Sequence, residues 1–196
     1  MLAQLGSADG LFTLSGAAAA LSLPAVDTVA KLGRFLAAYQ TQVLIPLDLP
    51  AICRAHQHAT RNQARELVAL DRELGRRQTH HALASASQRV GQNQLRCLRP
   101  LRDERVVRRY LQAVEDAQAH AWHTLVYGLT LAVYSLPVRQ GLLNYARQTL
   151  QGFICAAARP LRLSALECRA LVEKRCEKLP RKVEALMAEC TNGNDF

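Results

Sequence analysis

Apolar residues recur at steps of three and four along most of the chain, and prolines separate the segments in which they do so. That spacing places apolar side chains on one face of an α-helix. No segment alternates apolar and polar residues over the length of a strand, and no hairpin turn sequence is present. The sequence therefore predicts an all-α fold, a compact bundle of about seven to nine helices, with residues 1–196 forming a single domain.

The first long helix is expected after Pro24, with Asp27 or Thr28 as its N-cap. Proline lacks the N–H that an interior helical position must donate, so Pro46 and Pro50 are expected to end this helix. One face of it is predicted to form a buried stripe made of Val29, Leu32, Leu36, Tyr39 and Val43.

Further helices are expected over residues 61–74 and 81–98, and Gly75 is predicted to stop the first of them. Residues 1–24 lack a clean period and are expected to be irregular with a short helix. Residues 191–196 are polar and are expected to form a flexible tail.

A helix that begins near Asp103 is predicted to break near His120. The part after the break is apolar nearly all round, which indicates a central helix. Its buried residues are predicted to be Trp122, Leu125, Leu129 and Val133. The last helices are expected to start at Pro137 and at Ser164, with an interruption at Pro180 and an end near Cys190.

The formal charge of +9 and the pI near 9.7 come almost entirely from arginine. Most of these arginines lie in residues 54–77 and 96–109, with acidic residues such as Asp71 interleaved. This pattern fits the solvated face of a helical protein, a surface for an acidic partner, or a surface for nucleic acid. Nucleic acid is the least expected partner, because the aromatic residues lie mainly at apolar helical positions and not among the arginines.

Six cysteines form no CxxC or CxxH pair, so buried free thiols in a reducing compartment are expected in place of a zinc or disulfide framework. The most hydrophobic run, residues 124–136, is shorter than the ~20 residues needed to cross a bilayer. The apolar residues 11–25 lack a basic leader, because no Lys or Arg precedes Lys31. We therefore expect a cytoplasmic protein without a membrane span.

No P-loop, GxGxxG or GxSxG motif occurs, so neither nucleotide binding nor hydrolase chemistry is predicted. His120 and His123 are three residues apart and can share a helix face, but two histidines make at most half of a metal site. A helical metal-dependent enzyme that uses this pair is kept as an alternative. The expectation is a binding protein with no catalytic residue, no metal ligand and no cofactor.

Several segments, taken in order, resemble the UreF family of urease accessory proteins. Residues 5–18 (LGSADGLFTLSGAA) retain Phe12 and Ser15 of its opening motif, D-S-x-x-P-x-G-G-F-x-x-S-x-G-L-E. Residues 84–95 (ASASQRVGQNQL) are similar to the family segment A-S-x-x-x-G-x-x-L and match it at Ser87 and Gly91. Residues 123–128 (HTLVYG) resemble the core motif H-x-x-V-x-G, and residues 156–163 (AAARPLRL) resemble A-A-x-R-L, which places Arg159 on the family arginine.

The resemblance implies an all-α homodimer that links the UreD/UreH scaffold to the nickel-carrying GTPase UreG, so that nickel is inserted into the urease apoprotein. It also implies structural roles for four motif residues, Ser87, Gly91, His123 and Gly128. Phe12, Ser15 and Arg159 are expected to bind a partner. Phe12 lies in a Gly-rich stretch without a clean period, and aromatic side chains are favoured interface anchors; the alternative is that Phe12 plugs the bundle. The resemblance suggests that Arg159 pairs with a carboxylate of the partner or of a second protomer; the alternative is that its charge opposes the helix dipole. A basic helical protein that binds nucleic acid or acts in regulation is the alternative.

Overall fold

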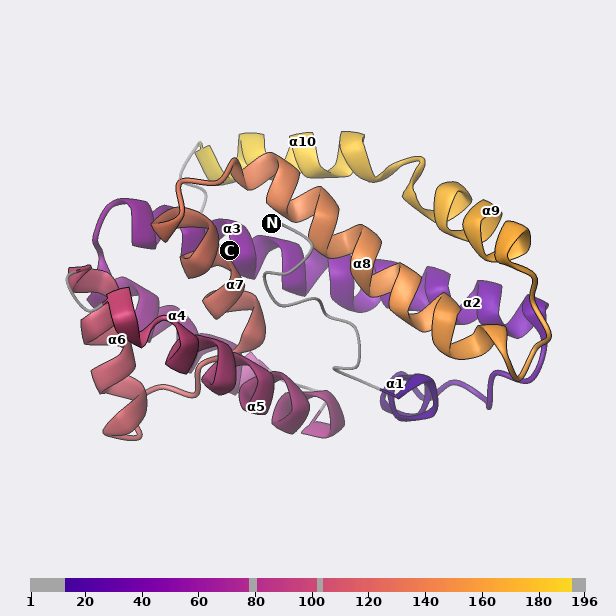
Figure 1. Cartoon of the computed structure of the whole chain (residues 1–196), viewed down its shortest axis with the longest axis horizontal. Coiled ribbons are helices and arrows are strands. Elements are labelled where there is room, and N and C mark those ends of the chain that lie inside the picture. Colours follow the sequence, from indigo (N-terminus) through magenta and orange to yellow (C-terminus); the bar gives the residue numbers. More distant parts are fainter. Residues whose placement is uncertain (1–12, 78–80, 102–103, 192–196) are drawn as a thin grey trace.

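The computed structural model describes residues 13–77, 81–101 and 104–191. Within these ranges the chain consists of helices joined by turns and irregular segments, and no strand occurs there. The expected all-α class is confirmed. In Figure 1, α8 crosses the molecule diagonally, α9 and α10 lie along one edge, and α4, α5 and α6 gather at the opposite lower corner.

The described N-terminal part holds a short helix followed by one continuous helical stretch from Val29 to Thr60. Its elements are α1 (Leu14–Ala20), α2 (Val29–Tyr39), the π-helix η2 (Gln40–Asp48) and α3 (Leu49–Thr60). The predicted N-cap is confirmed, since the Thr28 hydroxyl accepts a hydrogen bond of 3.2 Å from the backbone N–H of Lys31.

The prediction that prolines end the α2 helix is wrong. Pro46 lies inside η2, and Pro50 occupies the second position of α3. In a π-helix the backbone hydrogen bonds span five residues, so the wider turn accommodates a residue without an N–H. Pro50 lacks an N–H where η2 runs directly into α3, and the chain remains helical through that position.

The middle of the chain forms α4 (Ala64–Arg77), α5 (His81–Cys97), the short 3₁₀ helix η3 (Arg99–Leu101) and α6 (Arg105–Glu115). The prediction that Gly75 stops α4 is wrong, because this residue lies within the helix. A Cβ atom placed on Gly75 would lie 3.5 Å from the His120 ring, at ordinary packing distance. Gly75 is thus a packing position of α4 and not its cap.

The C-terminal half forms α7 (His123–Val133), α8 (Val138–Ala158), α9 (Ala165–Cys176) and α10 (Leu179–Thr191). The break before α7 and the starts at Pro137 and Ser164 are confirmed. Ser164 and Glu167 form a capping box, in which each side chain accepts a hydrogen bond from the other residue's backbone N–H.

Two clusters of buried apolar side chains make up the core, and α7 contributes to both. Leu125, Val126 and Leu129 belong to the cluster that includes residues of α3 to α6. Tyr127 and Leu131 belong to the other, which includes residues of α1, α2, α8, α9 and α10. The prediction of a central helix is confirmed, because every residue from His123 to Leu131 is buried. Val133, near the end of α7, is half-buried, so the predicted stripe stops one turn earlier.

Three residues predicted to be buried are exposed. Val29 is 46% exposed because it opens α2, just beyond the core. Cys97 and Cys155 are exposed on the outer faces of α5 and α8, whereas Cys53 is buried. Among the described residues, no helix combines the length and apolar character that crossing a membrane requires.

Candidate partner-binding site

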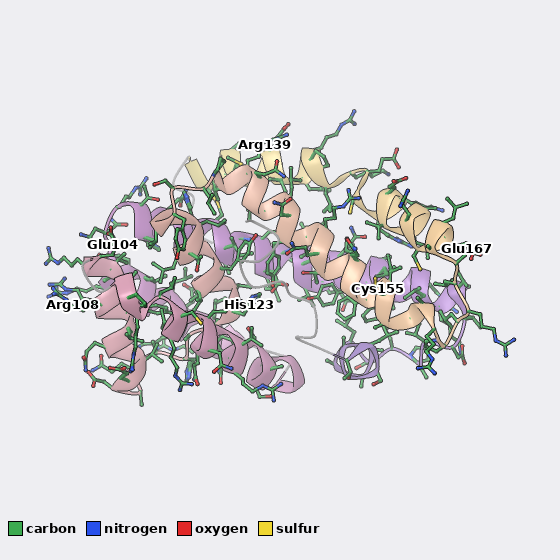
Figure 2. All side chains as sticks on the ribbon, viewed as in Figure 1. Glu104, Arg108, His123, Arg139, Cys155 and Glu167 are labelled. Atoms are coloured by element: carbon green, nitrogen blue, oxygen red, sulfur yellow. The ribbon has the colours of Figure 1, made fainter. Side chains whose placement is uncertain are left out.

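The crossing of α5 and α7 brings three motif residues together. Gly91 and Ser87 are four residues apart and therefore share one face of α5. The Ser87 hydroxyl accepts a hydrogen bond of 3.2 Å from the backbone N–H of His123, the first residue of α7. Figure 2 labels His123 at the centre of the molecule, where the two helices meet.

Gly91 is required at this crossing because the segment before α7 lies against its Cα. A Cβ atom there would overlap the carbonyl oxygen of Ala121 and would lie 2.8 Å from the backbone nitrogen of His123. Contacts of a Cβ with backbone atoms at that distance cannot relax by a side-chain rotation. Gly91 thus sets how closely α5 approaches the start of α7.

Gly128 plays the same role where α7 crosses α3. A Cβ atom on Gly128 would lie 2.5 Å from the carbonyl oxygen of Ile52 and 2.8 Å from the Cβ of Ala55. The two motif glycines therefore fix α7 against α5 on one side and against α3 on the other. Ser87 and His123 belong to the same contact between α5 and α7.

Asp71 anchors the irregular segment that leads into α7. Its carboxylate accepts hydrogen bonds from the backbone N–H of His120 at 2.6 Å and of Ala121 at 3.0 Å. It also accepts one of 2.6 Å from the Tyr110 hydroxyl. The Trp122 indole donates to the Asp71 backbone carbonyl at 3.0 Å. The sequence pattern placed Asp71 among solvated charges, and this is wrong because Asp71 is fully buried.

A group of aromatic rings lies on the other side of His123. The rings of Tyr127 and Tyr145 are 5.2 Å apart, and that of Tyr145 is 5.7 Å from the imidazole of His123. On the neighbouring η2 helix, the Asp48 carboxylate accepts a hydrogen bond of 3.3 Å from the hydroxyl of Tyr39. Burial raises the pKa of Asp48 to about 7, and the bond from Tyr39 offsets part of that increase.

The two histidines of the metal-enzyme alternative have different surroundings. His120 is exposed and stacks edge-on against Trp122, with ring centres 5.8 Å apart. His123 is buried among the tyrosines. The described residues contain no group of three or more His, Cys, Asp or Glu side chains placed to hold a metal ion. The geometry thus gives no support to a site built on this histidine pair.

The structure describes two of the three residues that are expected to bind a partner. Phe12 lies outside the described residues. Ser15 is exposed on α1, where its hydroxyl donates a hydrogen bond of 3.3 Å to the Thr13 hydroxyl. Arg159 is exposed at the C-cap of α8, and its side chain makes no ion pair or hydrogen bond within the described part of the chain.

Two exposed apolar residues lie on the first turns of helices that reach the same end of the molecule as the C-terminus of α8. Leu166 is 76% exposed on the first turn of α9, and Val29 is 46% exposed on the first turn of α2. The end of α8 and the starts of α2 and α9 meet at one end of the long axis of the molecule (Figure 1). Figure 2 labels Glu167 at that end. We call this end of the molecule, whose helix termini carry Val29, Arg159 and Leu166, the α8–α9 end (Figure 1). From the sequence, only Arg159 was predicted to lie on a binding surface. Val29 matched the spacing of a buried stripe, and Leu166 belongs to no recognisable pattern of apolar residues.

Exposed arginines lie at the opposite end of the long axis, together with the exposed Glu104 (Figure 2). On α6, Arg105, Arg108 and Arg109 are exposed, and Figure 2 shows Arg108 pointing outward there. A hollow of about 320 Å³ between α4 and α6 is lined by Arg65, Arg72 and Arg109, and no acidic side chain lines it. We call α6 with this hollow the α6 end.

Aromatic platforms for nucleic acid are scarce on this surface. Of the aromatic residues that the structure describes, only Tyr134 is exposed, at 41%, and it follows α7 and is not part of α6. The α6 end therefore offers charge without the stacking surfaces that single-stranded nucleic acid uses.

The described residues thus define an all-α protein whose motif residues serve packing and whose exposed ends carry groups suited to contact other proteins. A model of the UreF family matches residues 26–174, which is most of the chain. The chain belongs to the UreF family of urease accessory proteins. The matched region includes five residues of the resemblance, Ser87, Gly91, His123, Gly128 and Arg159, and it leaves out the N-terminal motif. A comparison with curated proteins gives no match.

Proposed function

We propose that this protein is an adaptor in urease maturation, which binds the UreD/UreH scaffold and recruits the GTPase UreG for nickel insertion into the urease apoprotein. The observation that carries this proposal is membership of the UreF family over residues 26–174. The proposed setting is the cytoplasm, and the proposed form is a homodimer.

The placement of the two ends supports an adaptor. An adaptor has to hold two partners at once, so its two binding surfaces must not overlap. The α8–α9 end presents two exposed apolar side chains and an unpaired arginine, a composition typical of protein interfaces. The α6 end presents several arginines, a composition that suits an acidic surface. The two lie at opposite ends of the long axis (Figure 1).

The α6 end is proposed to act mainly on the rate at which the partner associates and on its orientation. Exposed charges contribute more to the rate and orientation of an encounter than to final affinity. The binding that depends on this end is therefore expected to weaken strongly with added salt. Binding through Leu166 and Val29 is expected to depend much less on salt, because it rests on the burial of apolar surface.

Co-purification tests this proposal directly. The tagged protein is co-expressed with UreD/UreH, UreG and urease subunits, and the expected result is a complex that contains all of them and restores nickel-dependent urease activity. Leu166→Ser and the pair Arg105→Glu with Arg108→Glu are each expected to release a different partner. Matched controls are Tyr134→Ser, another exposed apolar residue, and Arg181→Glu, an exposed arginine on α10.

Each outcome bears on a different statement. Failure of the wild-type chain to bind any of these proteins would overturn the adaptor. Loss of the same partner from both variants would overturn the assignment of two separate ends. Binding of nucleic acid that is lost in the α6 variant and kept in Arg181→Glu would favour the alternative of a nucleic-acid-binding protein.

A further inference from the structure

Two cysteines from distant parts of the sequence meet where α10 packs on α3. Cys53 and Gln57 are four residues apart and share one face of α3. The Gln57 side chain donates a hydrogen bond of 3.2 Å to the backbone carbonyl of Cys190, near the end of α10. This bond holds the Cys190 backbone beside the face of α3 that carries Cys53.

The two thiols are hydrogen-bonded to each other. Because of this bond, the pKa of Cys190 lies below its ordinary value and that of Cys53 lies well above it. Burial adds to the increase at Cys53. The Arg54 guanidinium favours the Cys190 thiolate and Glu189 opposes it. The half-buried Cys190 is therefore the better nucleophile, and the buried Cys53 carries the proton.

A hollow beside α3 reaches Cys53, and Cys190 on α10 is itself only half-buried. The hollow has a volume of about 270 Å³, and Cys53, His56, Gln57 and Arg61 are among the residues that line it. No acidic side chain lines it, whereas the exposed Arg61 contributes a positive charge. An anionic peptide thiol or disulfide of the size of glutathione therefore meets a favourable charge at the entrance.

We propose that Cys53 and Cys190 form a redox modification site at which a small anionic disulfide of the glutathione type converts the two thiols into an intramolecular disulfide. The Cys190 thiolate attacks one sulfur of glutathione disulfide, forms a mixed disulfide and expels one glutathione thiolate. The Cys53 thiol then gives its proton to the first glutathione thiolate, through solvent, and attacks the Cys190 sulfur, which expels the second glutathione as a thiolate that takes a proton from solvent. Both protein thiols are oxidised, and one glutathione disulfide is reduced to two glutathione molecules.

The proposed bond would tie α10 to α3. It closes a loop that contains most of the chain, and such a cross-link lowers the conformational entropy of the unfolded state. We therefore expect the Tm to rise by about 5 °C or more on oxidation. The proposal does not depend on the adaptor function, since the measurements below use the isolated protein.

Peptide mapping tests the proposal on the wild-type chain. The reduced protein is equilibrated with glutathione disulfide, free thiols are blocked with an alkylating reagent, and the protein is digested with trypsin. The expected product joins residues 35–54 to residues 183–196, each of which contains one cysteine. Its mass is that of the two peptides less two hydrogen atoms, and it separates into them on reduction.

Serine variants provide the controls. Cys190→Ser is expected to lose both the joined peptide and the rise in Tm, whereas Cys168→Ser on α9 is expected to keep both. Recovery of residues 183–196 only as an alkylated peptide or as a glutathione adduct would overturn the proposal. So would an unchanged Tm on oxidation of the wild-type protein, a measurement that does not require any variant to fold.

Discussion

The Tyr110 hydroxyl on α6 donates a 2.6 Å hydrogen bond to the buried carboxylate of Asp71 on α4. The same carboxylate accepts the backbone N–H groups of His120 and Ala121, so one side chain joins α4, α6 and the segment before α7. Burial and the neighbouring Asp71 raise the pKa of Tyr110 well above its ordinary value, which keeps this hydroxyl a donor.

Asp71→Ala is expected to lower the free energy of unfolding by about 3–5 kcal/mol, because it leaves buried donors without an acceptor. Tyr110→Phe removes one donor together with its bond and is expected to cost about 1–2 kcal/mol. Urea unfolding followed by circular dichroism measures both. Asp116→Asn, at an exposed position after α6, is the control and is expected to change stability by less than about 0.5 kcal/mol. Equal stability of Asp71→Ala and the wild type would show that this network is not needed for the fold.

Gly91→Ala and Gly128→Ala are expected to destabilise the protein by about 2–4 kcal/mol each, because the added Cβ meets backbone atoms at both crossings. Gly75→Ala is the matched control in a helix interior. Its Cβ would meet only the ring atoms of His120 and Trp122, at 3.5 Å or more. That change is expected to be neutral or to stabilise by up to about 1 kcal/mol, since alanine favours helix over glycine. A similar Tm for all three variants would refute the close approach of α7 to α5 and α3.

Leu129→Asp is expected to prevent folding, because an unpaired charge at a fully buried position costs several kcal/mol against a total stability of about 5–15 kcal/mol. Leu166→Asp makes the same change at a position that is 76% exposed and is expected to leave the fold intact. Far-UV circular dichroism and size-exclusion chromatography compare the two. A folded Leu129→Asp protein would contradict the central place of α7.

Asp48 makes stability depend on pH. The pKa of its carboxyl group is about 7 in the folded protein and ~3.9 in the unfolded chain, so the folded state binds the proton more tightly. The stability that this group contributes is complete below about pH 4 and is lost as the pH rises through 7.

Asp48→Asn is neutral at every pH, so its stability relative to the wild type is expected to increase between pH 5 and pH 8. The expected gain is on the order of 2–4 kcal/mol, and urea unfolding at several pH values measures it. If the free energies of unfolding of Asp48→Asn and the wild type changed with pH in parallel, the Asp48 carboxyl group would have the same pKa in the folded and unfolded chain.

Arg159→Lys separates two roles for the arginine at the end of α8. If its charge only opposes the helix dipole, worth about 0.3–1 kcal/mol, lysine replaces it almost fully. We expect instead a paired contact between the planar guanidinium and a carboxylate of the UreD/UreH scaffold or of a second protomer, which lysine does not reproduce. The expected result is binding weakened about tenfold at an unchanged Tm, measured by calorimetry and differential scanning. Unaltered affinity would limit Arg159 to a structural role.

The spacing of apolar residues was enough to predict the helical class, the break before α7 and the burial of Leu125 and Leu129. Caps such as Thr28 and Ser164 were also predictable, since a short polar side chain before an apolar period stabilises a helix start locally. These features depend on residues near one another in the chain, so the sequence alone determines them.

Tertiary packing decided the rest. Pro46 and Gly75 did not end their helices, because the π-turn of η2 and the contacts of α4 with His120 and Trp122 outweigh local preference. The burial of Asp71 depends on donors 39 to 50 residues away, and no local pattern reveals them. The end of the molecule that carries Val29, Arg159 and Leu166, and the meeting of Cys53 with Cys190, likewise exist only because distant helices pack together.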